Sequence, residues 1–198
     1  MNIMMKYTLV IGLIFFCNTT FSQSKNKLEN DSLFYHELPE YPTEFTAGTM
    51  AARMVDALGF RFYWASEGLS ESDLVFKPND DARSTSETVD HIFGLSYIIV
   101  NSTLKKPNGK SDSSKLSYSE KRQQILVNLK TAADKLRLSK DVSEYKIIFG
   151  DKEIPFWNQV NGPIADAIWH CGQIASFRRI SGNPINPNVN HFNGRVRQ

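Results

Sequence analysis

Two residue types that bind metal ions lie one helical turn apart near the C-terminal end of the chain. Asp166 and His170 are four residues apart in a stretch that we expect to be helical. On an α-helix this spacing places the two side chains within about 40° of each other around the axis. Ile174 lies on the same broad face, which therefore points towards the interior. A carboxylate and an imidazole placed in this way could hold one ion.

A second histidine faces inward from another expected helix. His91 shares a helical face with Leu95, Ile98 and Ser102. An inward histidine can be a metal ligand or a core residue held by hydrogen bonds, and periodicity alone leaves both interpretations open. Asp166 has a second interpretation too, because a negative charge in the first turns of a helix is favoured by the helix dipole.

Two capping boxes predict where the middle helices begin. In this motif a Ser at the cap and a Glu three residues later each accept a hydrogen bond from a free backbone amide. Ser84 with Glu87 predicts a helix that runs to about Leu104, and Ser117 with Glu120 predicts the next one. Residues 105–115 between them are rich in Ser, Gly and Pro and are expected to form an exposed loop.

The first and last helices are predicted from apolar periodicity and from helix-breaking residues. We expect the first over residues 43–67 and a connection without helix over residues 70–83. The last helix is expected to start at Gly162-Pro163 and to end at Gly182. The proposed core stripe of the first helix recurs at every fourth residue: Met50, Met54, Leu58 and Phe62.

These elements predict an all-α protein, a four-helix bundle with one small β-hairpin between helices three and four. Alternating residues on both sides of Gly150-Asp151 indicate the hairpin. We expect the bundle domain over residues 43–182, after an extended lead-in at 23–42 and before an irregular tail at 183–198.

The N-terminal residues resemble a secretory signal peptide. A lysine precedes about ten apolar residues, which are too few to span a bilayer, and small residues follow. We expect a signal peptide at residues 1–22, cleavage before Gln23, an exported periplasmic or secreted protein, and no membrane span afterwards. Lipid attachment at Cys17 is disfavoured by the bulky residues before it. The net charge of +2, with interspersed signs, argues against nucleic acid as a partner.

Three segments together resemble the DinB/YfiT-like family. They are residues 69–78, the run from Ser84 to His91, and His170-Cys-Gly-Gln173 followed by Arg178-Arg179 and Gly182. The likeness covers roughly residues 43–182. It implies a four-helix bundle that forms dimers and binds a divalent metal through one histidine of helix two and a His-x-x-x-His pair of the last helix. His91 matches the first ligand and His170 the last.

Asp166 stands where this family usually has a histidine. The set His91, Asp166 and His170 is still a competent site, because two histidines and one carboxylate bind zinc and non-haem iron with positions left open. We therefore expect a divalent cofactor, which could be zinc, nickel, iron or manganese.

The residues around His170 have simpler roles. Cys171 lies on an apolar face and is expected to pack in the core, although an exported free thiol could also react. We expect Gly172 to permit a close helix approach and Gln173 to form a hydrogen bond near the site. Asp90 points away from His91 and is expected to be solvated.

The sequence predicts a metal-dependent enzyme, of hydrolase or transferase type, acting on a small molecule that it does not identify. It names no catalytic residue beyond the ligands. The alternative is a non-catalytic bundle that binds a metal or small ligand, or whose site is degenerate. A third hypothesis is an interaction role, in which Trp64, Phe93 and Tyr97 would serve a homodimer contact.

Overall fold

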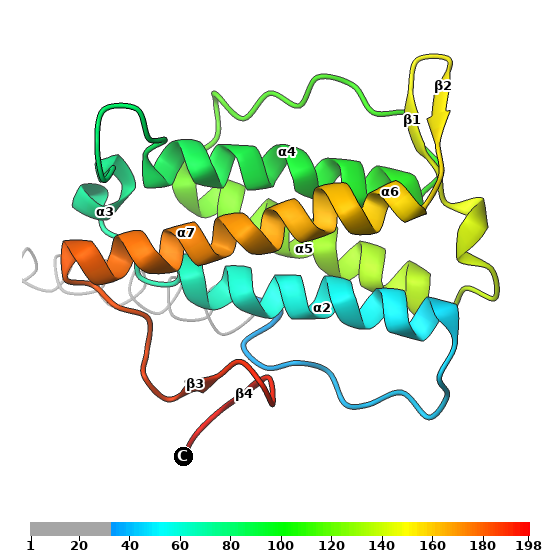
Figure 1. Ribbon diagram of the computed structural model, residues 1–198, viewed down its shortest axis with the longest axis horizontal. Helices are drawn as coiled ribbons and strands as arrows, with labels where there is room; N and C mark the ends of the chain where they lie inside the picture. Colours follow the sequence, from blue (N-terminus) through cyan, green and yellow to red (C-terminus); the bar gives the residue numbers. More distant parts are fainter. Residues whose placement is uncertain (1–32) are drawn as a thin grey trace, which may run out of the picture. The chain divides into compact units, whose positions relative to one another are not determined.

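Helical elements make up more than half of residues 33–198, the part of the chain that the computed structural model describes (Figure 1). The expected signal peptide, and the lead-in up to residue 32, lie outside the described residues. The helical elements are α2 (Ala47–Ser66), α3 (Glu71–Val75), α4 (Thr85–Thr103), α5 (Tyr118–Arg137), the 3-10 turn η2 (Val142–Glu144), α6 (Trp157–Gln159), the π turn η3 (Val160–Ile164) and α7 (Ala165–Ser181). The strands are β1 (Ile147–Phe149), β2 (Lys152–Ile154), β3 (Val189–Asn190) and β4 (Arg195–Val196).

The long helices α2, α4, α5 and α7 lie side by side as a helical bundle (Figure 1). Helices α4 and α5 run in the same direction, so the chain must return along the bundle between them. Residues 104–117, which we call the crossover segment, make this return (Figure 1). The amide of Asn108 donates to the carbonyl oxygen of Ile148 at one end (2.7 Å). Near the other end, the Ser113 hydroxyl donates to Asp90 (2.9 Å).

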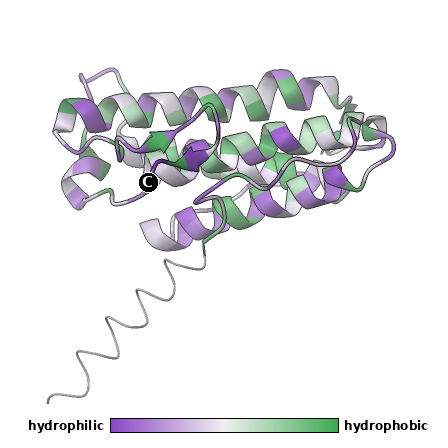
Figure 2. Ribbon diagram, turned by 90° about the horizontal axis from the view of Figure 1, so that it is seen from below, coloured by the Kyte–Doolittle hydropathy of each residue, from purple (hydrophilic) through white to green (hydrophobic). Residues whose placement is uncertain are grey.

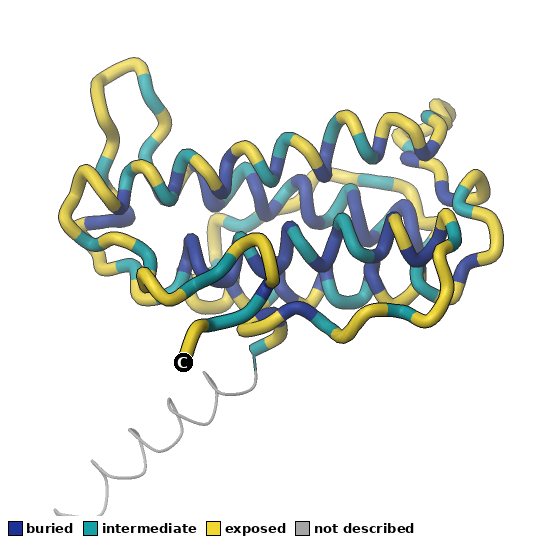
Figure 3. The backbone as a smooth tube through the Cα atoms, turned by 60° about the horizontal axis from the view of Figure 1, so that its bottom comes forward, coloured by how far each residue is buried: buried dark blue, intermediate teal, exposed yellow. Residues whose placement is uncertain are grey.

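The core lies between the long helices. Hydrophobic and hydrophilic residues alternate along them in Figure 2, and the buried residues in Figure 3 lie on the sides that face neighbouring helices. The expected core stripe of the first helix is partly wrong, because the Met50 side of α2 faces solvent and Met50 is 51% exposed. Smaller residues occupy the inner side of α2 at this level. The fully buried large side chains include Leu58, Phe60, Phe62, Ile92, Ile99, Ile125, Leu126, Leu129 and Leu136.

Capping boxes start the helices as predicted. Ser84 with Glu87 begins α4, and Ser117 with Glu120 begins α5. A further box, Ser70 with Asp73, begins the short helix α3 inside the stretch that we expected to be free of helix. That prediction was wrong because the polar composition of this stretch was taken to exclude a helix. Asp73 can fill the third helical position that Glu takes in the other two boxes.

The last helical segment begins earlier than predicted. Helix α6 starts at Trp157, and Pro163 lies inside the π turn η3 rather than at a helix start. Proline has no amide hydrogen to donate, and a π turn changes the local hydrogen-bond pattern so that the helix continues past it. The end is as predicted, with Gly182 in the left-handed conformation (φ 86°) after α7.

The predicted hairpin is present, whereas the tail is more regular than expected. Strands β1 and β2 pair antiparallel around Gly150-Asp151. In the tail, β3 and β4 also pair, and this hairpin contacts the lead-in, where Leu38 donates to the carbonyl oxygen of Gly194 (2.9 Å). Among the described residues, no helix is both long and apolar enough to cross a membrane.

Candidate metal centre

The three candidate ligands meet where α4 and α7 pack together. His91 comes from α4, and Asp166 and His170 come from successive turns of α7. The Nε2 atom of His91 lies 3.0 Å from Oδ2 of Asp166, and the Nε2 atom of His170 lies 3.3 Å from Oδ1 of the same carboxylate. One ligand atom from each residue lies within 4.8 Å of the other two. The structure therefore brings all three residues together in a cluster that could hold a metal ion.

The cluster is open to solvent on one side. The side chains of His91 and Asp166 are 33% and 36% exposed, whereas that of His170 is 11% exposed. The two imidazole rings are nearly perpendicular, with centroids 4.6 Å apart. A site that is anchored on one side and exposed on the other leaves room for water or a small molecule beside the protein ligands.

Gln173 is a hydrogen-bond partner of His170. Its Oε1 lies 2.7 Å from Nδ1 of His170, as the sequence predicted for a partner near the site. In the tautomer with the proton on Nδ1, His170 donates to this oxygen, since a carbonyl oxygen only accepts. In a neutral His170 the lone pair is then on Nε2, the atom that faces Asp166. This tautomer is the one that a metal ligand binding through Nε2 requires.

The arrangement of ligand atoms suits a cation. The lone pair of His170 and a carboxylate oxygen of Asp166 face each other at 3.3 Å, and two acceptors at this distance repel unless positive charge lies between or beside them. A second proton on His170 or a metal ion would supply that charge. The donor set of two imidazoles and one carboxylate therefore fits a divalent ion.

The structural alternatives for the ligands lose support. His91 is one-third exposed and its imidazole forms a hydrogen bond with Asp166, so it is not an ordinary core histidine. Asp166 does not lie at a free helix start, because the helical segment already begins at Trp157. The amide of Ala165 donates to carbonyl oxygens of the π turn, so the backbone entering α7 has no need of Asp166 as a cap.

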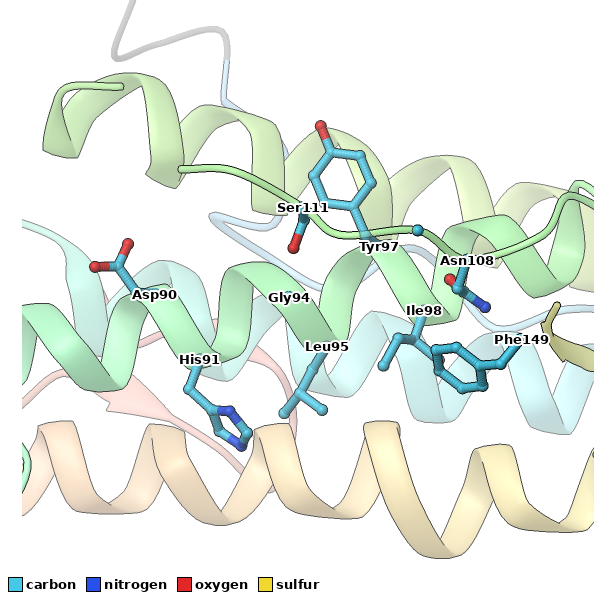
Figure 4. Close-up of a pocket in the computed structure, with 10 residues that line it drawn as sticks. Asp90, His91, Gly94, Leu95, Tyr97, Ile98, Asn108, Ser111 and Phe149 are labelled. Atoms are coloured by element: carbon cyan, nitrogen blue, oxygen red, sulfur yellow. The ribbon is translucent and has the colours of Figure 1, made fainter. Parts of the chain in front are cut away.

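A groove adjoins the cluster on the His91 side. It lies between α4 and the crossover segment, has a volume of about 230 Å³, and is closed at one end by β1 (Figure 4). In Figure 4 the His91 side chain points towards α7, and Asp90 lies on the other side of α4. Sequence reasoning missed this groove, since its far wall comes from a loop and a hairpin. Its lining residues from outside α4 are Asn108, Gly109, Ser111 and Phe149.

Predictions for the neighbouring residues had mixed outcomes. Cys171 is buried, and burial raises the pKa of its thiol to about 12, as expected for a packing role. The expected close approach at Gly172 is wrong, because nothing lies within 4 Å of where its Cβ would be. Asp90 is not simply solvated, since its carboxylate pairs with Lys121 (2.7 Å).

Two of the three residues of the expected aromatic contact surface are buried, and Tyr97 is half-buried. Trp64 and Phe93 are buried in the core, and the indole nitrogen of Trp64 donates to the carbonyl oxygen of His36 (3.1 Å). Side chains buried within one chain cannot form the centre of a dimer interface.

Comparison with known proteins adds no relative. The chain matches no protein-family model, no curated protein and no solved structure.

Proposed function

We propose that this protein is an exported, DinB-like four-helix bundle that binds one divalent metal ion through His91, Asp166 and His170. We propose further that it acts as a hydrolase or transferase on a small molecule. The observation that carries this proposal is the convergence of three ligand atoms from two helices within 4.8 Å, on a partly exposed side of the bundle. The resemblance of residues 43–182 to the DinB/YfiT-like family supports the same ligand positions.

Each residue of the cluster has a defined task in this proposal. His91 and His170 offer imidazole nitrogen, Asp166 offers a carboxylate oxygen, and Gln173 holds the proton on Nδ1 of His170. The oxygen ligand weakens any preference for soft metals, so zinc, iron, nickel and manganese all remain candidates. A divalent ion held here would supply Lewis acidity to a substrate carbonyl or to water. We assign no general base.

One observation favours a second function, a non-catalytic binding protein. Asp166 already contacts both histidines directly, at 3.0 and 3.3 Å. With an extra proton on an imidazole, this His-Asp-His arrangement is a complete hydrogen-bonded network that needs no metal. Metal binding tests whether the cluster is a metal site or this metal-free network.

The decisive experiment is elemental analysis of residues 23–198, purified without chelator or histidine tag. We expect about one metal ion per chain. His91→Ala and His170→Ala should lose it. His36→Ala, which removes a histidine that stacks on Trp64 outside the cluster, should retain it. Full metal content in His170→Ala would contradict the assignment. No bound metal, even after addition of zinc, nickel, iron or manganese, would instead support the non-catalytic binding protein.

Export can be tested separately. The mature protein should be recovered from the periplasm or the medium, and its first residue should be Gln23 on N-terminal sequencing. Recovery of a chain that still begins at Met1 would refute cleavage without affecting the metal site.

A further inference from the structure

The groove beside His91 has the chemistry of a ligand site. We propose that it binds an uncharged small molecule with an aromatic or short alkyl body, one end of which lies at His91. This inference rests on the proposed function, because it makes the groove the substrate site of the metal centre.

The floor and one end of the groove are apolar. Leu95 and Ile98 line it from α4, and Phe149 closes the end furthest from His91 (Figure 4). The ring of Phe149 is partly exposed (43%), although it is a large hydrophobic side chain at the edge of a pocket. Covering this ring and the two aliphatic side chains would remove apolar surface from water, which favours binding of an apolar body.

The charges around the groove disfavour ionic ligands. No lysine or arginine is among its lining residues. Asp90 is its only carboxylate, and Asp90 is already paired with Lys121 (2.7 Å) and with the hydroxyl of Ser113 (2.9 Å). A charged ligand would lose its hydration without gaining an opposite free charge in the groove. Phosphorylated and carboxylated molecules are therefore poor candidates for this part of the site.

Polar groups on the crossover segment set a limited hydrogen-bonding capacity. The Asn108 amide is used within the wall, since its Oδ1 accepts from Asn101 (3.1 Å) and its Nδ2 donates to the carbonyl oxygen of Ile148 (3.3 Å). The Ser111 hydroxyl faces α4 across the groove at Gly94. One hydroxyl suits a ligand that carries a single carbonyl, amide or hydroxyl group.

The size of the groove restricts the ligand further. Its volume of about 230 Å³ equals that of about eight water molecules at ~30 Å³ each. Sites for drug-sized ligands are larger, roughly 300–1,000 Å³. From His91 to Ile98 the helix rises about 10 Å. One ring or a short chain with one polar group fits this space.

Gly94 keeps the groove open. A Cβ at this position would meet only the Ser111 hydroxyl oxygen, at 3.7 Å, so a small side chain is tolerated and a larger one must extend into the groove. Gly172 on α7 offers a matched control. It also lies within a helix, and a Cβ there would meet nothing within 4 Å.

The test compares three probes that share one ring and differ in charge: benzamide, benzoate and benzylamine. Binding to protein stripped of metal with chelator is followed by two-dimensional NMR of the backbone amides. We expect benzamide to bind at least tenfold more tightly than either charged probe and to shift the amide signals of Gly94, Gly109 and Ser111. Gly94→Leu should weaken benzamide binding at least tenfold, whereas Gly172→Leu should leave it unchanged.

Two outcomes would overturn the inference. One is benzamide binding that Gly94→Leu leaves intact, or no binding at all. The other is tighter binding of benzoate or benzylamine than of benzamide. Because metal is absent from this test, its result is independent of the metal centre. A protein that binds benzamide in the groove but never binds metal would uphold the ligand site and refute only the proposed metalloenzyme.

Discussion

Replacing Gln173 by leucine tests whether the second partner of His170 supports metal binding. The substitution removes the oxygen that lies 2.7 Å from Nδ1 of His170 while keeping a side chain of similar size. Loss of such a partner typically lowers metal affinity by ~10–100-fold, or about 1.4–2.8 kcal/mol. We expect the upper part of this range, because His170 is only 11% exposed and water cannot readily replace the lost acceptor. Gln173→Glu should bind metal at least as tightly as the native chain, since a carboxylate raises the basicity of the imidazole.

The assay is a competition titration of zinc against a chromophoric chelator. Gln124→Leu is the matched control, because it removes an amide that donates to Asn128 (2.8 Å) on α5, a helix that contributes no ligand. Native affinity in Gln173→Leu, or an equal loss of affinity in both leucine variants, would contradict this expectation. The second result would show a general loss of stability instead of a defect in the positioning of His170.

Three further predictions concern stability and reactivity. Arg178 is buried and donates to carbonyl oxygens at the C-terminal end of α2, including that of Glu67 (2.6 Å). Arg178→Met should therefore lower the free energy of urea unfolding by about 3 kcal/mol, since charged hydrogen bonds contribute ~1.5–3 kcal/mol each and are not additive. The pKa of the Asp73 carboxyl is raised by burial but lowered by hydrogen bonds from Ser70, Asn183 and Ser181. The hydrogen bonds have the larger effect, so this pKa lies below its usual value of 3.8. Its stabilising contribution is thus present above pH 3.8 and is lost as the pH falls further. In acid titrations followed by circular dichroism, Asp73→Asn should be less stable than the native chain near neutral pH. Its stability should then fall less than that of the native chain as the pH is lowered. The Cys171 thiol, with its pKa raised to about 12 by burial, should resist iodoacetamide at about pH 8 until urea unfolds the chain, as measured by mass spectrometry.

Features that depend on neighbouring residues could be predicted from the sequence. The boxes at Ser84 and Ser117 and the turn after Gly182 involve groups a few residues apart, and all lie where expected. Asp166 and His170 belong to the same class, because four residues on one helix fix their separation. Placing His91 beside them required the additional assumption that α4 packs against α7, which the family resemblance supplied and the structure confirms.

Features that depend on tertiary packing could not be predicted. The groove exists because the crossover segment returns along α4, and nothing in the composition of residues 105–115 specifies that path. The exposed side of α2 was also misplaced. A stripe that recurs every four residues, as from Met50 through Met54 to Leu58, drifts around the helix, and packing against α5 decides which side faces inward. Pro163 was taken as a helix start because proline favours that position, and its accommodation in a π turn has no local signal.

In the proposed metal site, the third ligand, Asp166, and the lining of the groove both favour an uncharged substrate. A divalent ion on three histidines would keep its full charge, whereas the carboxylate of Asp166 removes one positive charge from the site. The attraction for an anionic substrate falls accordingly, and the groove that leads away from His91 offers no lysine or arginine to restore it. Asp166 is therefore the ligand expected of a site that acts on uncharged molecules. In the metal-loaded protein, the preference for benzamide over benzoate should be smaller in Asp166→His than in the native chain. An unchanged preference would show that the third ligand does not affect which substrate binds.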